Sequence, residues 1–191
     1  YPLRRQRQMC IRDRLKGTGI LISLGLMATH IWALLNSDAT QGFLKKFPRD
    51  YKWGAILLTI DFFWAMLLMS YMDMGEFFHL RSWFLLIIPA AFVLVLIFVR
   101  EFLAVRALGA LMLLVSGPVL TAAFLQPPAS RLLIPILAYV WIIAGMFFVG
   151  MPFLMRDWVN WITNTTARWK FAVISGIAYG AVMLIVALVD W

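Results

Sequence analysis

Trp83–Val99 reads WFLLIIPAAFVLVLIFV, a run of apolar residues without a single charge. A helix that crosses a hydrocarbon core of about 30 Å needs about 20 such residues. Polar and apolar residues do not alternate in this run, as they would in a strand of a membrane barrel. Since a backbone in lipid must satisfy its own hydrogen bonds, the run predicts a transmembrane helix.

Five further stretches have similar length and composition, and short charged connections separate them. Of the 191 residues, 63% are hydrophobic and 14% are charged, whereas soluble domains carry about 25% charged residues. The sequence therefore predicts an all-α integral membrane protein, a single six-helix bundle over residues 15–191. The expected spans are Gly17–Leu35, Gly54–Met74, Ser82–Val99, Ala107–Leu125, Leu132–Met155 and Phe171–Val189.

The first fourteen residues, YPLRRQRQMCIRDR, are interpreted separately. The string MCIRDR resembles the translation of a transposase sequencing adaptor carried into a metagenomic reading frame, so residues 1–14 are expected to be an artefact without a structural role. The alternative is a natural basic leader. Without this segment, twelve Lys and Arg stand against eight Asp and Glu, and the net charge falls from +8 to +4. Cys10 is the only cysteine, so disulfide and thiolate chemistry are not expected in the rest of the chain.

The cations predict the orientation. Connections on one side of the membrane carry most of them, and the opposite side has only Lys16, Arg81 and Arg131. By the positive-inside rule the richer side faces the cytoplasm, which places both genuine termini on the opposite side of the membrane. We expect a protein of the bacterial inner membrane, so that both termini would be periplasmic. The cytoplasmic cations, which are also the expected contacts for lipid headgroups, are Lys45, Lys46, Arg49, Lys52, Arg100, Arg106, Arg156, Arg168 and Lys170.

Two of these connections mix cations with aromatic residues, GFLKKFPRDYKW at 42–53 and RDWVNWITNTTARWK at 156–170. This composition is typical of short segments that lie in the membrane interface and contact anionic lipid. The alternative is that they are ordinary positive-inside loops without a specific ligand. Nucleic acid is not an expected partner because no recognised binding module is present.

Small residues suggest helix packing. Ala172, Gly176 and Gly180 recur every four residues, so their stripe should pack closely, either inside the chain or as a homodimer face. Aligning Gly54, Gly109 and Gly176 also gives three similar helix starts, which indicates three repeated helical hairpins unless apolar low complexity produced the match.

Asp61 is the acid expected deep in a span, near the bilayer midplane. An ionisable group there costs about 2.5–3.5 kcal/mol and is a candidate ion or proton site. The structural alternative is a protonated or hydrogen-bonded acid that faces the bundle, with Trp64 or a hydroxyl such as that of Ser116 as its partner.

A second polar cluster, Asp73, Glu76, His79 and Arg81, falls in a predicted outer loop. Acids and imidazole at three-residue intervals are a weak signal for a metal or a proton relay, and simple solvation is the expected state. His30 and His79 should lie too far apart to bind one haem.

No nucleophile elbow, zincin motif or phosphate-binding loop accompanies these residues, so no catalytic residue, cofactor or metal is expected. We expect a non-enzymatic membrane subunit or assembly factor that acts through packing and through contacts with lipid, a membrane-protein partner or a second copy. The alternative is a small ion- or proton-coupled transporter that uses Asp61.

Overall fold

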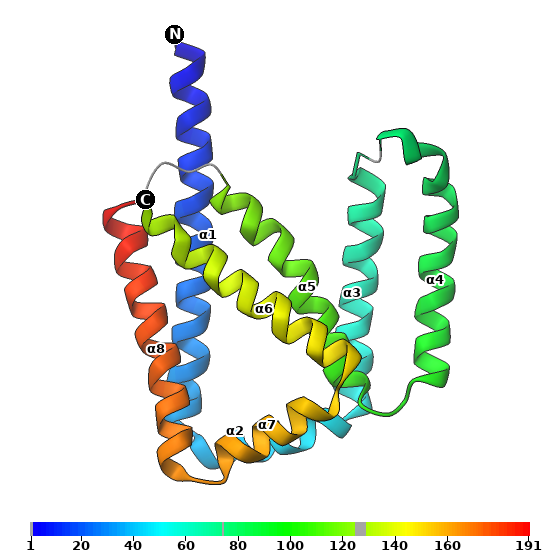
Figure 1. Cartoon of the computed structure of the whole chain (residues 1–191), viewed down its shortest axis with the longest axis vertical. Coiled ribbons are helices and arrows are strands. Elements are labelled where there is room, and N and C mark those ends of the chain that lie inside the picture. Colours follow the sequence, from blue (N-terminus) through cyan, green and yellow to red (C-terminus); the bar gives the residue numbers. More distant parts are fainter. Residues whose placement is uncertain (1, 74, 125–128) are drawn as a thin grey trace. The chain divides into compact units, whose positions relative to one another are not determined.

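The computed structural model describes residues 2–73, 75–124 and 129–191, and these form helices without any strand (Figure 1). The all-α prediction is confirmed. In chain order the helices are α1 (Pro2–Leu35), α2 (Ser37–Lys46), η1 (Phe47–Arg49), α3 (Tyr51–Tyr71), η2 (Gly75–Leu80), α4 (Arg81–Phe98), α5 (Leu103–Ala123), η3 (Ala129–Leu132), α6 (Leu133–Gly150), α7 (Phe153–Thr163) and α8 (Thr166–Val189).

Six of the described helical segments are long and apolar enough to cross a membrane, which indicates a multi-pass membrane protein. They correspond one to one with the six stretches expected from the sequence. These candidate spans are Leu15–Leu35, Tyr51–Tyr71, Phe78–Phe98, Leu103–Ala123, Ala129–Gly150 and Thr166–Val189.

The helix boundaries differ from the expected ones where local chemistry overrides hydropathy. α3 begins at Tyr51 rather than Gly54, because Asp50 caps it: its carboxylate accepts a hydrogen bond from the Lys52 backbone N–H at 2.9 Å. α1 begins at Pro2, so its backbone continues through the segment interpreted as an artefact. That interpretation stays a prediction.

The fifth expected span is too long at its C-terminal end. α6 ends at Gly150 rather than Met155, and a new helix, α7, begins at Phe153. Pro152 explains the break, because proline has no backbone N–H to continue the helical hydrogen bonds. Met155 and Val159 are buried along one side of α7, whereas Trp158 and Trp161 are exposed. The aromatic and basic segment after α6 is therefore an amphipathic helix.

Contacts divide the chain into two compact units. The first unit contains the chain up to Phe43 together with Ser116–Trp141 and Trp158–Trp191, and the second contains Leu44–Val115 and Ile142–Asp157. The boundaries between the units fall within α2, α5, α6 and α7, so each of these helices contributes residues to both units. We describe the units one at a time.

In the first unit, α1 and α8 pack along each other (Figure 1). Glycines in α8 allow this approach: a Cβ at Gly180 would lie 2.9 Å from Met27 Cγ, and a Cβ at Gly176 would overlap the imidazole of His30. Two hydrogen bonds attach the η3–α6 segment to the middle of α8 and to the residue that follows its C-cap. The Tyr179 hydroxyl donates to the Leu133 carbonyl at 2.6 Å, and the indole N–H of the final residue, Trp191, donates to the Ser130 hydroxyl at 3.1 Å.

In the second unit, α3 and α4 form a hairpin joined by η2 (Figure 1). The rings of Phe62 and Phe92 stack across it with centroids 4.6 Å apart. Gly54 brings α3 against the start of α5, because a Cβ there would lie only 2.7 Å from the Ala104 backbone nitrogen. α5 and α6 meet at another close approach, where Gly109 faces Gly145. These contacts hold α3, α4 and α5 around a groove.

Candidate functional site

Asp61 lies at the centre of α3, eleventh of its 21 residues. Its side chain is only 5% exposed. The burial follows from the surroundings, since residues one turn away on the same side of the helix, Leu58 and Ala65, are apolar and line the same groove. Asp61 therefore lies in the middle of its helix, and its expected position near the bilayer midplane stays a prediction.

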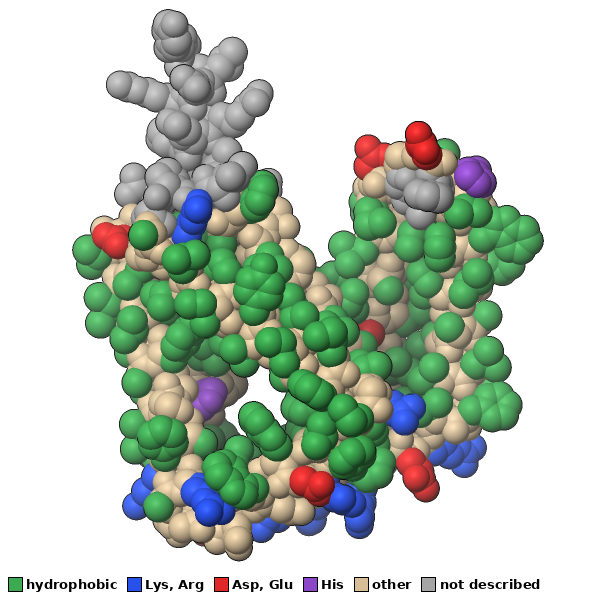
Figure 2. All heavy atoms as spheres, in the orientation of Figure 1, with side chains coloured by type: hydrophobic (Ala, Val, Ile, Leu, Met, Phe, Trp, Pro, Cys, Tyr) green, Lys and Arg blue, Asp and Glu red, His purple; other side chains and the backbone are tan. Residues whose placement is uncertain are grey.

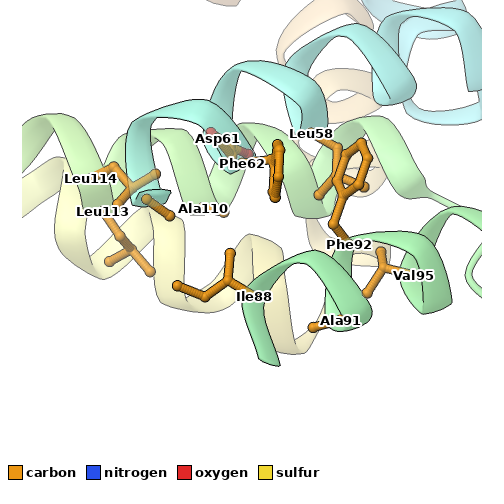
Figure 3. A pocket seen from close by; sticks show the side chains of 11 residues that line it. Leu58, Asp61, Phe62, Ile88, Ala91, Phe92, Val95, Ala110, Leu113 and Leu114 are labelled. Atoms are coloured by element: carbon orange, nitrogen blue, oxygen red, sulfur yellow. The ribbon is translucent and has the colours of Figure 1, made fainter. Parts of the chain in front are cut away.

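The groove beside Asp61 lies within the second unit and is open on one side, with a volume of about 390 Å³. Figure 3 shows side chains from three helices turned toward it. α3 contributes Leu58, Phe62 and Ala65 beside Asp61; α4 contributes Ile88, Ala91, Phe92 and Val95; and α5 contributes Ala110, Leu113 and Leu114. Asp61 is the only polar residue among them.

Neither carboxyl oxygen of Asp61 has a hydrogen-bond partner among the residues that the structure describes. The two partners suggested by the sequence therefore do not supply one. Ser116 is buried, and its hydroxyl donates instead to the Ala138 carbonyl at 3.4 Å. Trp64 makes no bond to the carboxyl group. A buried polar group without a hydrogen-bond partner costs about 1–3 kcal/mol or more of stability. The unpaired carboxyl group of Asp61 therefore destabilises the folded chain unless another molecule supplies a donor.

Chemically, the site can accept hydrogen bonds and pair with a cation, and little else. General acid–base or nucleophilic catalysis needs a second group positioned against the first, and the lining residues include no other titratable or nucleophilic side chain. No three His, Cys, Asp or Glu residues in the described part of the chain gather closely enough to hold a metal ion. The lining of the groove is therefore apolar except for the carboxyl group of Asp61.

The outer-loop cluster does not converge on a common centre. The Asp73 carboxylate accepts a hydrogen bond from the Gly75 backbone N–H at 3.1 Å. The guanidinium of Arg81 donates to two backbone carbonyls at the end of α3, Met69 at 3.1 Å and Met72 at 2.6 Å. It also lies over the Phe78 ring, 5.1 Å from the centroid. Arg81 therefore closes the α3–α4 turn. Glu76 and His79 are exposed on η2.

The predicted headgroup contacts lie near helix ends or in the connections. In the second unit, cations gather at the end of the α3–α4 hairpin opposite η2. Figure 2 shows blue side chains together with acidic ones at this end of the hairpin, and acidic side chains with a histidine at the other end. In the first unit, the guanidinium of Arg168 lies over the Trp161 ring at 4.7 Å. Arg156, which is partly exposed, pairs with Asp157 at 2.9 Å. The exposed members are Lys45, Lys46, Arg49, Lys52, Arg100, Arg106, Arg168 and Lys170.

The small-residue stripe of α8 lies partly against α1. Gly176 and Gly180 face His30 and Met27, whereas Ala172 is half-buried. Both glycines therefore serve packing inside the chain. The threefold hairpin repeat stays a prediction, since its three glycines contact different kinds of neighbour: backbone at Gly54 and Gly109, and an imidazole at Gly176.

Sequence reasoning missed the α4 and α5 walls of the groove. Their residues are ordinary apolar residues, and no local pattern separates a groove-lining alanine from one that faces lipid. One signal was present: Ala91 and Ala110 are small residues near the middle of their helices, as Asp61 is in α3. It also missed Gly145 as the partner of Gly109.

Comparison with protein-family models, curated proteins and solved structures finds no match to this chain.

Proposed function

We propose that this protein is a non-enzymatic subunit or assembly factor of the bacterial inner membrane, and that it binds another membrane component at the groove between α3, α4 and α5. The observation that carries the proposal is the buried carboxyl group of Asp61, which has no hydrogen-bond partner among the described residues and lines an open apolar groove. Intramembrane acids usually pair or mark a functional site. A groove that is apolar except for one hydrogen-bond acceptor is suited to bind another membrane component from within the bilayer.

The charge distribution supports an orientation for this subunit. The exposed cations at one end of the α3–α4 hairpin would face the cytoplasm and its anionic lipid headgroups, and both genuine termini would be periplasmic. The exposed indoles of Trp158 and Trp161 on α7 suit the headgroup region. Anionic lipid is thus a proposed second partner, distinct from the occupant of the groove.

A small ion- or proton-coupled transporter is the second candidate, favoured by the position of Asp61 at the centre of α3. Transport also needs a polar path that leads ions or protons to and from the acid. The lining of the groove offers no second polar side chain along such a path. For this reason we favour the binding role.

The groove can be tested by filling it. Ala91 lines the groove and its neighbour Ala90 is exposed but does not, so Ala91→Trp should block docking while Ala90→Trp serves as the matched control. Both variants are expressed in the native membrane and purified in mild detergent. We expect a co-purifying membrane component to be lost from Ala91→Trp alone. The same components with both variants would show that the groove is not the docking surface.

A flux assay separates the two candidates. The protein and its Asp61→Asn variant are reconstituted in liposomes, and proton entry is followed with an enclosed pH-sensitive dye. We expect no flux that depends on Asp61. If wild-type protein carries protons and a folded Asp61→Asn variant does not, the transporter is the correct function.

A further inference from the structure

We propose that the groove of the second unit binds a transmembrane helix of a different membrane protein, and that a lysine or arginine near the midpoint of that helix pairs with Asp61. This inference rests on the proposed function, and it names the chemistry of the partner. Four features of the structure lead to it.

The first feature is the state of the acid. Asp61 keeps only 5% of its relative solvent exposure, and both of its carboxyl oxygens lack a hydrogen-bond donor in the described chain. An occupant that is wholly apolar, such as a lipid acyl chain, would cover the groove and leave both acceptors unpaired. An occupant with donors removes that cost.

The second feature is the apolar wall. Ten of the eleven lining residues have apolar side chains, so most of the occupant's contact surface must also be apolar. A lysine or arginine side chain meets both requirements, because its hydrocarbon stem lies against apolar surface while its charged end reaches a polar group. Its positive charge is complementary to a carboxylate and provides several donors for the two oxygens.

The third feature is depth. Asp61 lies in the middle of α3, at the helix position farthest from both ends and hence from water. A soluble ligand would have to enter the hydrocarbon region to reach it. A helix that spans the membrane presents its central residue at this depth without leaving its own position.

The fourth feature excludes a second copy as the source of the cation. Every Lys and Arg in the described candidate spans lies within five residues of an end of its span. His30 is nearer to the centre of its span, but its Nδ1 lies 2.7 Å from the Leu26 carbonyl and its ring faces Gly176. Within the described residues, this chain therefore has no free basic group at the depth of Asp61, and the partner must be a different protein.

The test uses synthetic transmembrane peptides and the full chain reconstituted in phospholipid vesicles. One peptide is a Leu/Ala helix with a single central lysine, a second has leucine at that site, and a third has its lysine near one end. A photoreactive diazirine residue lies one turn from the central site in each, so adducts can be mapped by mass spectrometry. Binding is measured by fluorescence as a function of peptide-to-lipid ratio.

We expect the central-lysine peptide to bind about 3- to 20-fold more tightly than the other two, the range that interhelical polar contacts give in membranes. Its adducts should fall on α3, α4 and α5. Asp61→Leu should remove the preference, and Asp61→Asn, which keeps the shape but not the charge, should reduce it. Ala91→Trp should block all groove binding, whereas Ala90→Trp should not.

The outcomes distinguish this inference from the function on which it rests. If all three peptides bind equally and Ala91→Trp blocks them, the groove binds helices but the basic partner is wrong. If no peptide binds in the groove, the inference is wrong as well. If a phospholipid with a photoreactive acyl chain labels Ala91 and Leu113 and no peptide displaces it, the groove holds lipid, and both the inference and the docking role fail.

Discussion

The crossing of α5 and α6 gives the sharpest test of the second unit, because two glycine backbones meet there. A Cβ added at Gly145 would lie 2.8 Å from the Gly109 carbonyl oxygen, and a Cβ at Gly109 would lie 2.8 Å from the Gly145 carbonyl oxygen. Ordinary contact begins at 3.4 Å. Gly145→Ala must therefore separate the two backbones by roughly 0.6 Å, since no flexible side chain can move aside.

A gap of about 0.5–1 Å forfeits a quarter to a half of the dispersion energy of the contacts that it opens. Overpacked sites of this kind lose about 1–3 kcal/mol, from which up to about 1 kcal/mol is recovered because alanine favours a helix over glycine. Subtracting this gain from the loss, we expect Gly145→Ala to lower the free energy of unfolding by up to about 2 kcal/mol. The double variant with Gly109→Ala should cost less than the sum of the two single variants, because the first separation makes room for the second Cβ.

The assay is reversible unfolding in mixed micelles of mild detergent and dodecyl sulfate, followed by far-UV circular dichroism. Gly150→Ala is the matched control, because it lies at the end of the same helix and a Cβ there would meet nothing within 4 Å. If Gly145→Ala and Gly150→Ala unfold at the same detergent fraction, or if the double variant is fully additive, the close crossing of α5 and α6 is refuted.

Three other predictions concern the rest of the chain. Gly176→Leu should destabilise the first unit by about 1–3 kcal/mol and lower its detergent melting temperature, because the new side chain overlaps the imidazole of His30. Gly25→Leu is the control and should leave the melting temperature unchanged, because a Cβ at Gly25 would meet nothing within 4 Å. Tyr179→Phe should cost about 1 kcal/mol through loss of its 2.6 Å hydrogen bond, and equal stability of the two proteins would show that the bond contributes nothing. Reporter fusions should be active in the cytoplasm after Lys46 and in the periplasm after His79, and the reverse pattern would overturn the proposed orientation.

The sequence was sufficient to predict the number and the type of the long helices. In the hydrocarbon core of a membrane every backbone N–H and C=O group must be hydrogen-bonded within the protein, and long apolar segments meet this requirement as helices. It was less reliable at helix ends, where one side chain decides the boundary. Asp50 starts α3 early and Pro152 stops α6 early. Both residues were visible in the sequence, but a hydropathy window averages over such single groups.

Asp61 could be predicted as a candidate because charge is rare within a span and its position in the helix fixes its depth. What surrounds it could not be predicted. The groove depends on which apolar faces of α4 and α5 meet α3, and those faces are chemically alike. The close contact between glycines could not be predicted for the same reason. Gly109 was noticed as part of a repeat, but its partner Gly145 is 36 positions away on another helix.

The pairing of α1 with α8 also sets an order of events during synthesis. Ser23 and Gly180, which touch across this pair, are separated by 157 positions of chain. At about 5–20 residues per second, roughly 8–30 s pass between the synthesis of these two positions. During that interval the packing face of α1 is exposed to lipid or to the insertion machinery. A chain that stalls before α8 therefore leaves α1 without its main packing partner.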